Sequence, residues 1–277
     1  MYYPVSSTAY RLVEAAADRV PTMDALRMAA GTLGFRGEDD REDALQIVAA
    51  FPTIVAAYWR LLRGDEPVEP DCELPHAANY LYMLSGEVPS AEHVRALEIY
   101  LNAASDHGMN ASTFAARVIV STRSDVVSAI TGAVGALKGP LHGGAPGPAL
   151  DIVFDIGEAS RAKPYLRAKL ERGERLMGFG HRIYKARDPR ADVLGAAAER
   201  LFATDADRDL YRLAVTVEET AVRLLEEYKP GADSTPTLST TPRFCCTAWG
   251  CRRSSSRPPS LPAGWRGGRR TASSSGS

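Results

Sequence analysis

The chain has 277 residues, of which 45% are hydrophobic and 24% charged, and its formal net charge is -1. This composition is typical of a globular protein with a sizeable core, and the near-neutral charge argues against a general attraction to nucleic acid or anionic membranes. The sequence has no uncharged apolar run of about 18 residues and no signal-peptide pattern, so we expect a cytoplasmic protein that does not span a membrane.

Apolar residues recur at spacings of three and four along most of the chain, which predicts amphipathic helices. In chain order, the clearest segments are residues 7–20, 41–64, 91–104 and 207–230. The stretch 114–139 is rich in Ala and β-branched residues and has few charges, which predicts one or two helices buried in the core. No segment alternates convincingly as a strand would, so the sequence predicts an all-α fold.

The character of the sequence changes after Asp233. Residues 234–277 contain seven Arg and ten Ser but no Asp, Glu or Lys, and their apolar residues form no periodic face. Such a composition predicts a disordered tail. A basic arm for acidic partners and a metal site at Cys245, Cys246 and Cys251 are alternatives, although the cysteines lack further ligands at metal-binding spacing. We expect no metal site.

Three of the five histidines lie in glycine-containing turns. His107 occurs in SDHGMNASTF, His142 in KGPLHGGAPG, and His181 in LMGFGHRIYKARDPRAD. Glycine lets the backbone approach a ligand closely and lets an imidazole project into a cleft. The other two, His76 and His93, lie in or beside helical segments, and we interpret them as surface or structural groups.

The turn around His181 is also strongly basic. Arg182, Lys185, Arg187 and Arg190 follow within ten residues, and Pro189 is suited to the first position of a helix. A guanidinium near a helix N-terminus favours an anionic ligand, so this turn indicates a carboxylate or phosphate site. A solvated basic turn is the alternative.

Together, the motifs DHGMNASTF, GPLHGGA and GFGHRIYKARDPRA resemble the citrate synthase family, in the order in which that family carries them. The upstream stretch ANYLYMLSGEVPS is similar to the family as well, and the resemblance covers about residues 20 to 230. It implies a helical enzyme with a large domain at residues 1–145 and a smaller domain at residues 146–233, both incomplete, followed by the tail at residues 234–277. It also implies a homodimer.

The resemblance further implies an acyltransferase of the tricarboxylic acid cycle that condenses acetyl-CoA with oxaloacetate and releases citrate and CoA. His142 would hydrogen-bond the thioester oxygen, and His181 would polarise the oxaloacetate carbonyl. His107 and Arg190 would hold the oxaloacetate carboxylates. No cofactor is implied, because the CoA thioester is a substrate. The CoA-binding positions would be Leu176, Met177, Gly178, Phe179, Gly180 and Lys185.

The catalytic carboxylate of the family is absent from this chain, because no Asp or Glu follows Asp233. Reading the codons one nucleotide back turns Phe244–Thr247 into a residue followed by Leu-Leu and then His or Tyr, whatever synonymous codons are used. With permitted codons, the same frame reads LYTNVEYYAAVLLHGVGL, which resembles the family's missing segment and contains a Glu. We therefore hypothesise that residues 234–277 are a frameshifted translation, which a nucleotide read of the gene would test.

Two alternatives to citrate synthesis follow from the sequence. The first is 2-methylcitrate synthesis from propionyl-CoA, because one extra methylene changes binding by only about 1–3 kcal/mol and the acyl pocket cannot be identified from the sequence. The second is a catalytically inactive relative that binds CoA or oxaloacetate, which the missing carboxylate favours.

Overall fold

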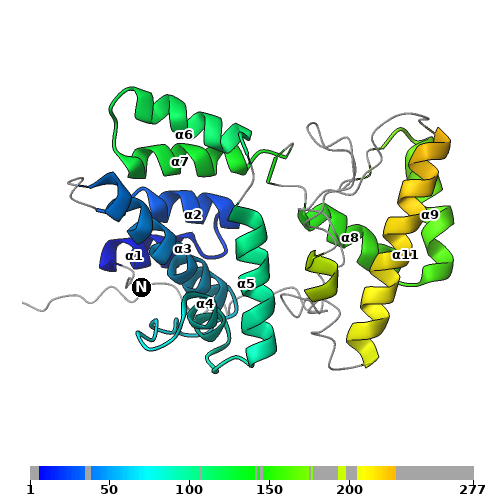
Figure 1. Ribbon diagram of the computed structural model, residues 1–277, viewed down its shortest axis with the longest axis horizontal. Coiled ribbons are helices and arrows are strands. Elements are labelled where there is room, and N and C mark those ends of the chain that lie inside the picture. The colour runs from blue at the N-terminus through cyan, green and yellow to red at the C-terminus, as the bar shows by residue number, and fades with distance from the viewer. Residues whose placement is uncertain are drawn as a thin grey trace, which may run out of the picture.

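The computed structural model describes residues 6–34, 39–105, 108–140, 142–143, 146–174, 176, 193–197 and 205–228 (Figure 1). Every regular element in these ranges is a helix, which confirms the predicted all-α class. The helices are α1 (Ser7–Ala16), α2 (Thr22–Ala30), α3 (Asp40–Leu62), α4 (His76–Ser85), α5 (Ala91–Ser105), α6 (Ala111–Ser121), α7 (Val126–Leu137), α8 (Pro146–Ile156), α9 (Ala159–Glu171) and α11 (Asp205–Tyr228). Residues 193–197 are also helical.

Local side chains define where several helices begin. Asp39 accepts a hydrogen bond from the Arg41 N–H at the start of α3, and Asp125 accepts one from the Ser128 N–H at the start of α7. The first N–H groups of a helix have no partner within the helix, so a side-chain acceptor just before it stabilises that end. The sequence therefore contains its own helix start signals at these positions.

The first group of helices packs around a core rich in alanine. Ala9 and Val13 of α1, Ala29 of α2, and Ile47 and Ile54 of α3 are buried together. Small side chains allow helix axes to approach closely, and each fully buried aliphatic side chain contributes about 1.5–3 kcal/mol. α3 is long and apolar enough to cross a membrane, but its contacts with α1, α2, α4 and α7 explain its apolar character as that of a core helix.

The second group consists of α8, α9 and α11, which pack against one another (Figure 1). Its core includes Val153 and Ile156 of α8, Leu166 of α9, and Val217 and Leu224 of α11. The short helix at residues 193–197 contacts the first group, because its buried Leu194 packs against Ile99, Tyr100 and Ala103 of α5. The domain boundaries at residues 145 and 233 stay predictions.

The core burial predicted for residues 114–139 is wrong for α6. This helix has no buried residue, and Phe114 and Val118 are 62% and 49% exposed. One side of α6 packs on α7, where a methyl group added to Gly132 would overlap Ile119. Apolar composition shows that a helix needs a partner surface, but it does not show whether that surface belongs to the same chain.

Candidate functional site

The site begins with the turn that holds His142, directly after α7. The N–H of His142 donates to the carbonyl oxygen of Gly139 at 2.9 Å, and the N–H of Gly143 donates to that of Leu137 at 2.9 Å. The chain therefore folds back over the last turn of α7 and leaves the His142 side chain half-buried. This agrees with the predicted glycine-containing turn.

Gly143 is required for this turn. A Cβ atom at Gly143 would lie 2.6 Å from the carbonyl oxygen of Leu137 and 2.6 Å from its Cδ1 atom. A backbone oxygen that already accepts a hydrogen bond cannot move away cheaply, so a larger residue would displace the turn. The glycine thus permits a close approach between the turn and α7, whereas the motif predicted an approach between the backbone and a ligand.

The imidazole of His142 is held by the first turn of α6, which lies beside the end of α7. Its Nε2 atom lies 2.9 Å from the Oγ atom of Ser112. The same Oγ lies 2.7 Å from Oδ1 of Asn110, which is the N-cap of α6 and also accepts the N–H of Thr113 at 2.9 Å. Ser112 and Asn110 were not predicted as site residues, although both lie in the motif DHGMNASTF.

This network couples the Ser112 hydroxyl to the tautomer of His142. Ser112 has one hydroxyl proton and two acceptors within reach. When the proton points to Asn110, Ser112 accepts from an Nε2–H of His142. When it points to His142, Nε2 accepts and the proton of a neutral imidazole is on Nδ1, which then becomes a donor. The direction of the Ser112 hydroxyl proton therefore decides which ring nitrogen of a neutral His142 carries the proton and can donate.

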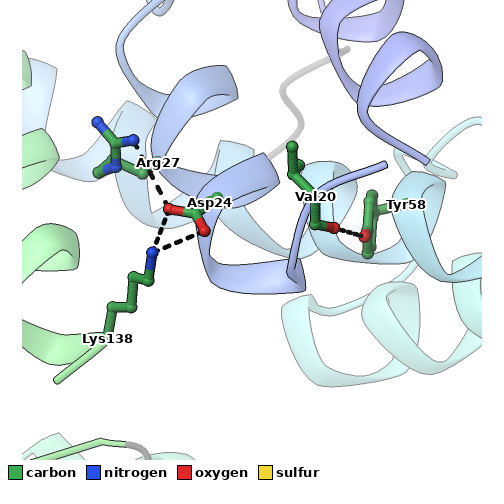
Figure 2. A network of polar contacts seen from close by, with 5 residues as sticks. All are labelled: Val20, Asp24, Arg27, Tyr58 and Lys138. Atoms are coloured by element: carbon green, nitrogen blue, oxygen red, sulfur yellow. Dashed lines mark hydrogen bonds and ion pairs between the residues drawn. The ribbon is translucent and has the colours of Figure 1, made fainter. Parts of the chain in front are cut away.

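The start of the turn is anchored to α2 by an ion pair (Figure 2). The Nζ atom of Lys138 lies 2.7 Å from both carboxylate oxygens of Asp24, and Arg27 lies 3.6 Å from one of them. The hydrogen bond from Lys138 lowers the pKa of Asp24 below its ordinary value. Asp24 therefore stays ionised at neutral pH. Figure 2 also shows the Tyr58 hydroxyl donating to the carbonyl oxygen of Val20 at 2.9 Å, which holds the residues before α2 against α3.

Most of the other predicted site residues lie outside the described residues. These are His107, His181, Arg190, Met177, Gly178, Phe179, Gly180 and Lys185. Gly108, directly after His107, has a φ of +59°, a left-handed conformation that favours glycine. The side chain of Leu176 is buried in the core of α8, α9 and α11. Its CoA contact stays a prediction.

Two histidines that were interpreted as structural lie apart from this network. His76 is the first residue of α4 and is half-buried, and burial lowers its pKa because the charged imidazole loses solvation. His93 is exposed on α5, and its Nδ1 atom lies 2.8 Å from the Oγ atom of Ser90. Among the residues that the structure describes, no three His, Cys, Asp or Glu side chains are grouped as metal ligands would be.

Comparison with known proteins supports the resemblance found in the motifs. The family model for the citrate synthase C-terminal domain matches residues 2–253. Citrate synthase 2 of Bacillus subtilis (strain 168) is 44% identical over 210 residues, which are 73% of this chain and 56% of that protein. The 2-methylcitrate synthase of Mycobacterium tuberculosis (strain ATCC 35801 / TMC 107 / Erdman) is 45% identical over 190 residues, which are 66% of this chain and 48% of that protein.

A solved structure shows the same fold. It is the citrate synthase of the thermophilic archaeon Thermoplasma acidophilum in a ternary complex with carboxymethyl coenzyme A and oxaloacetate, with a TM-score of 0.78 and 26% identity. The alignment covers 89% of this chain and 65% of that chain. The chain spans about half the length of the curated relatives that it matches. Because the family model matches most of the sequence, the chain belongs to the citrate synthase family.

Proposed function

We propose that this protein is an acyltransferase that condenses acetyl-CoA with oxaloacetate to give citrate and CoA. The observation that carries the proposal is the half-buried His142, held in its turn by glycines and at its ring by Ser112. The names of its relatives support the substrates, as do the CoA analogue and oxaloacetate bound by the Thermoplasma acidophilum enzyme.

The chemistry needs a hydrogen-bond donor where His142 lies. Removal of a methyl proton next to a thioester places negative charge on the thioester oxygen, so a prearranged donor at that oxygen lowers the barrier. A neutral imidazole donates without adding a full positive charge. In the tautomer with its proton on Nδ1, Ser112 donates to Nε2 and Nδ1 is the donor available to the substrate. The predicted roles of His181, His107 and Arg190 remain part of the proposal.

The reaction also needs a base at the methyl carbon. The family resemblance implies a base in a segment after residue 233, and residues 234–277 contain no Asp or Glu. This observation favours a second candidate, a relative that binds CoA or oxaloacetate without turnover. The two candidates differ in whether oxaloacetate triggers CoA release.

The acyl group is a separate question. Relatives named citrate synthase and 2-methylcitrate synthase match this chain at 44% and 45% identity, so similarity does not separate acetyl-CoA from propionyl-CoA. We propose acetyl-CoA as the main substrate. Comparing kcat/KM for the two thioesters tests this choice, and a higher value with propionyl-CoA would replace it with 2-methylcitrate synthesis.

The experiment that tests the proposal measures free CoA thiol released from acetyl-CoA with and without oxaloacetate. We expect release only with both substrates, and its loss in His142→Ala. His93→Ala is the matched control, because His93 is exposed on α5 and its ring contacts Ser90. Retained binding of acetyl-CoA or oxaloacetate without release would select the binding-only candidate, and neither binding nor release would refute both.

The proposal includes a homodimer in the cytoplasm. The exposed apolar face of α6 supports the dimer, because Phe114 and Val118 lie one helical turn apart on that face. The exposed free thiol of Cys72 supports a reducing compartment.

A further inference from the structure

The ion pair between Lys138 and Asp24 joins parts of the chain that are 114 positions apart. Lys138 directly follows α7 and precedes His142 by four residues, whereas Asp24 lies in the first turn of α2. The Asp24 side chain is 16% exposed and that of Lys138 is 46% exposed, and both oxygens of Asp24 contact the same Nζ atom at 2.7 Å. The contact is short and involves both carboxylate oxygens, so it can define a position.

Backbone hydrogen bonds hold both Lys138 and His142 at the end of α7. The Lys138 N–H donates to Val134 at 3.0 Å, and the Gly139 N–H donates to Ala136 at 3.1 Å. Gly139 then accepts from the N–H of His142 at 2.9 Å. Lys138 and His142 are thus four positions apart and are held at the same helix end, so we expect a shift of Lys138 to displace the histidine.

The packing of α2 on α7 supports this ion pair. The two helices pack closely, since Cβ atoms added at Gly31 and Gly135 would lie 3.6 Å from Thr131 and 3.7 Å from Arg27, respectively. The first turn of a helix also favours a carboxylate, because the helix dipole places partial positive charge there. Asp24 is thus held in place by packing and kept ionised by its surroundings.

We propose that Lys138 and Asp24 are positioning residues that set the backbone of His142, while Ser112 sets its ring. This inference rests on the proposed function, because it assigns the pair a role in the same site. Neither residue is placed against the substrate, so each acts through His142. A displacement of about 1 Å at a reacting group can cost up to about a hundredfold in rate. Loss of the ion pair four residues before His142 should therefore lower the turnover rate.

Isosteric and conservative substitutions test the proposal in the full chain. Lys138→Met and Asp24→Asn remove the attraction with little change in volume, whereas Lys138→Arg keeps the charge and can still reach a carboxylate. Glu98→Gln is the matched control, because it removes a contact to Arg95 on the exposed side of α5. We expect Lys138→Met and Asp24→Asn to lower kcat about tenfold and to change the KM for oxaloacetate less than about twofold. Lys138→Arg should retain most of the kcat.

A second measurement does not depend on turnover. The chain has five histidines, so ¹⁵N-histidine NMR can resolve their rings, and His142→Gln identifies the resonances of His142. We expect Lys138→Met to shift the Nε2 resonance of His142 and Glu98→Gln to leave it unchanged. If wild-type chain releases no CoA, the proposed function fails while this measurement still decides the role of the pair.

The proposal is overturned if Lys138→Met and Asp24→Asn keep both the kcat and the His142 resonance of the Glu98→Gln control. In an inactive chain, an unchanged resonance alone overturns it. If either isosteric variant fails to fold, as judged by circular dichroism, Asp24→Glu decides by the same measurements. It keeps the charge but moves the carboxylate by one methylene, so an unchanged His142 resonance in Asp24→Glu overturns the proposal and a shift supports it.

Discussion

The Oγ atom of Ser112 lies 2.9 Å from the Nε2 atom of His142, although 30 positions separate the two residues in the chain. Ser112 is in the first turn of α6, and His142 is in the turn after α7. Because the two helices pack against each other, the beginning of one meets the end of the next. The contact with Ser112 therefore restricts rotation of the His142 ring.

Replacement of Ser112 by Ala should reduce catalysis without unfolding the protein. The substitution removes the hydroxyl that contacts Nε2 of His142 but leaves the α6 cap at Asn110 intact. We expect kcat to fall roughly tenfold to a hundredfold in the CoA-release assay, because the ring loses its orientation. Ser121→Ala is the control, since that hydroxyl donates to Val118 at the far end of α6. Equal rates for the two variants would contradict the role of Ser112.

Replacement of Asn110 by Ala should affect both stability and activity. It removes the N-cap of α6, which costs about 1 kcal/mol, and frees the Ser112 hydroxyl from its second acceptor. Asp125→Ala removes the cap of α7 and should cost a similar amount in urea unfolding. We expect only Asn110→Ala to lower kcat as well. If both variants keep the wild-type kcat, Asn110 acts as a cap alone.

Replacement of Gly143 by Ala should displace the His142 turn. The added Cβ would meet the Leu137 carbonyl oxygen, so we expect a loss of about 1–3 kcal/mol in stability together with most of the activity. Gly34→Ala is the matched control, because a Cβ there has no neighbour within 4 Å. The turn assignment is wrong if Gly143→Ala unfolds at the same urea concentration as Gly34→Ala.

The end of α9 should respond to acid through Glu174. Hydrogen bonds from Arg172 and Lys169 lower the pKa of Glu174 to about 2, from an ordinary value near 4.5. A carboxylate with a lowered folded-state pKa stabilises the protein above its unfolded-state pKa, and that contribution is lost as the pH falls toward 2. Glu174→Gln should therefore lower Tm at pH 7 by no more than about 3 °C, because the group is exposed. At pH 2 the difference from wild type should be much smaller, and an equal difference at both pH values would contradict the assignment.

The exposed face of α6 should be part of the dimer interface. Phe114→Glu or Val118→Lys places a charge on this face, which should shift the protein from dimer to monomer in sedimentation experiments. Val88→Lys is the control, since Val88 is 72% exposed before α5 and away from α6. A wild-type chain that is monomeric at micromolar concentration, or variants that remain dimeric, would contradict this interface.

The helices could be predicted from the sequence because their signals are local. Period and capping residues predicted segments such as 41–64, and the structure has α3 at Asp40–Leu62. Burial was harder to predict. Residues 114–139 are rich in apolar residues throughout, yet α7 contains the buried Ala129 and Val134 whereas α6 has no buried residue. Hydrophobicity indicates that a helix needs a partner surface, but it does not indicate whether that surface belongs to the same chain.

The sequence by itself determined the family, the helical class and the importance of His142, because the motifs and the helical periodicity are patterns of residues close together in the sequence. Only the tertiary structure revealed what holds that histidine. Ser112 and Asp24 reach the His142 turn from α6 and α2, and neither contact follows from spacing along the chain. Hydrogen bonds and ion pairs act over about 3 Å of space, so they depend on which helix ends packing brings together.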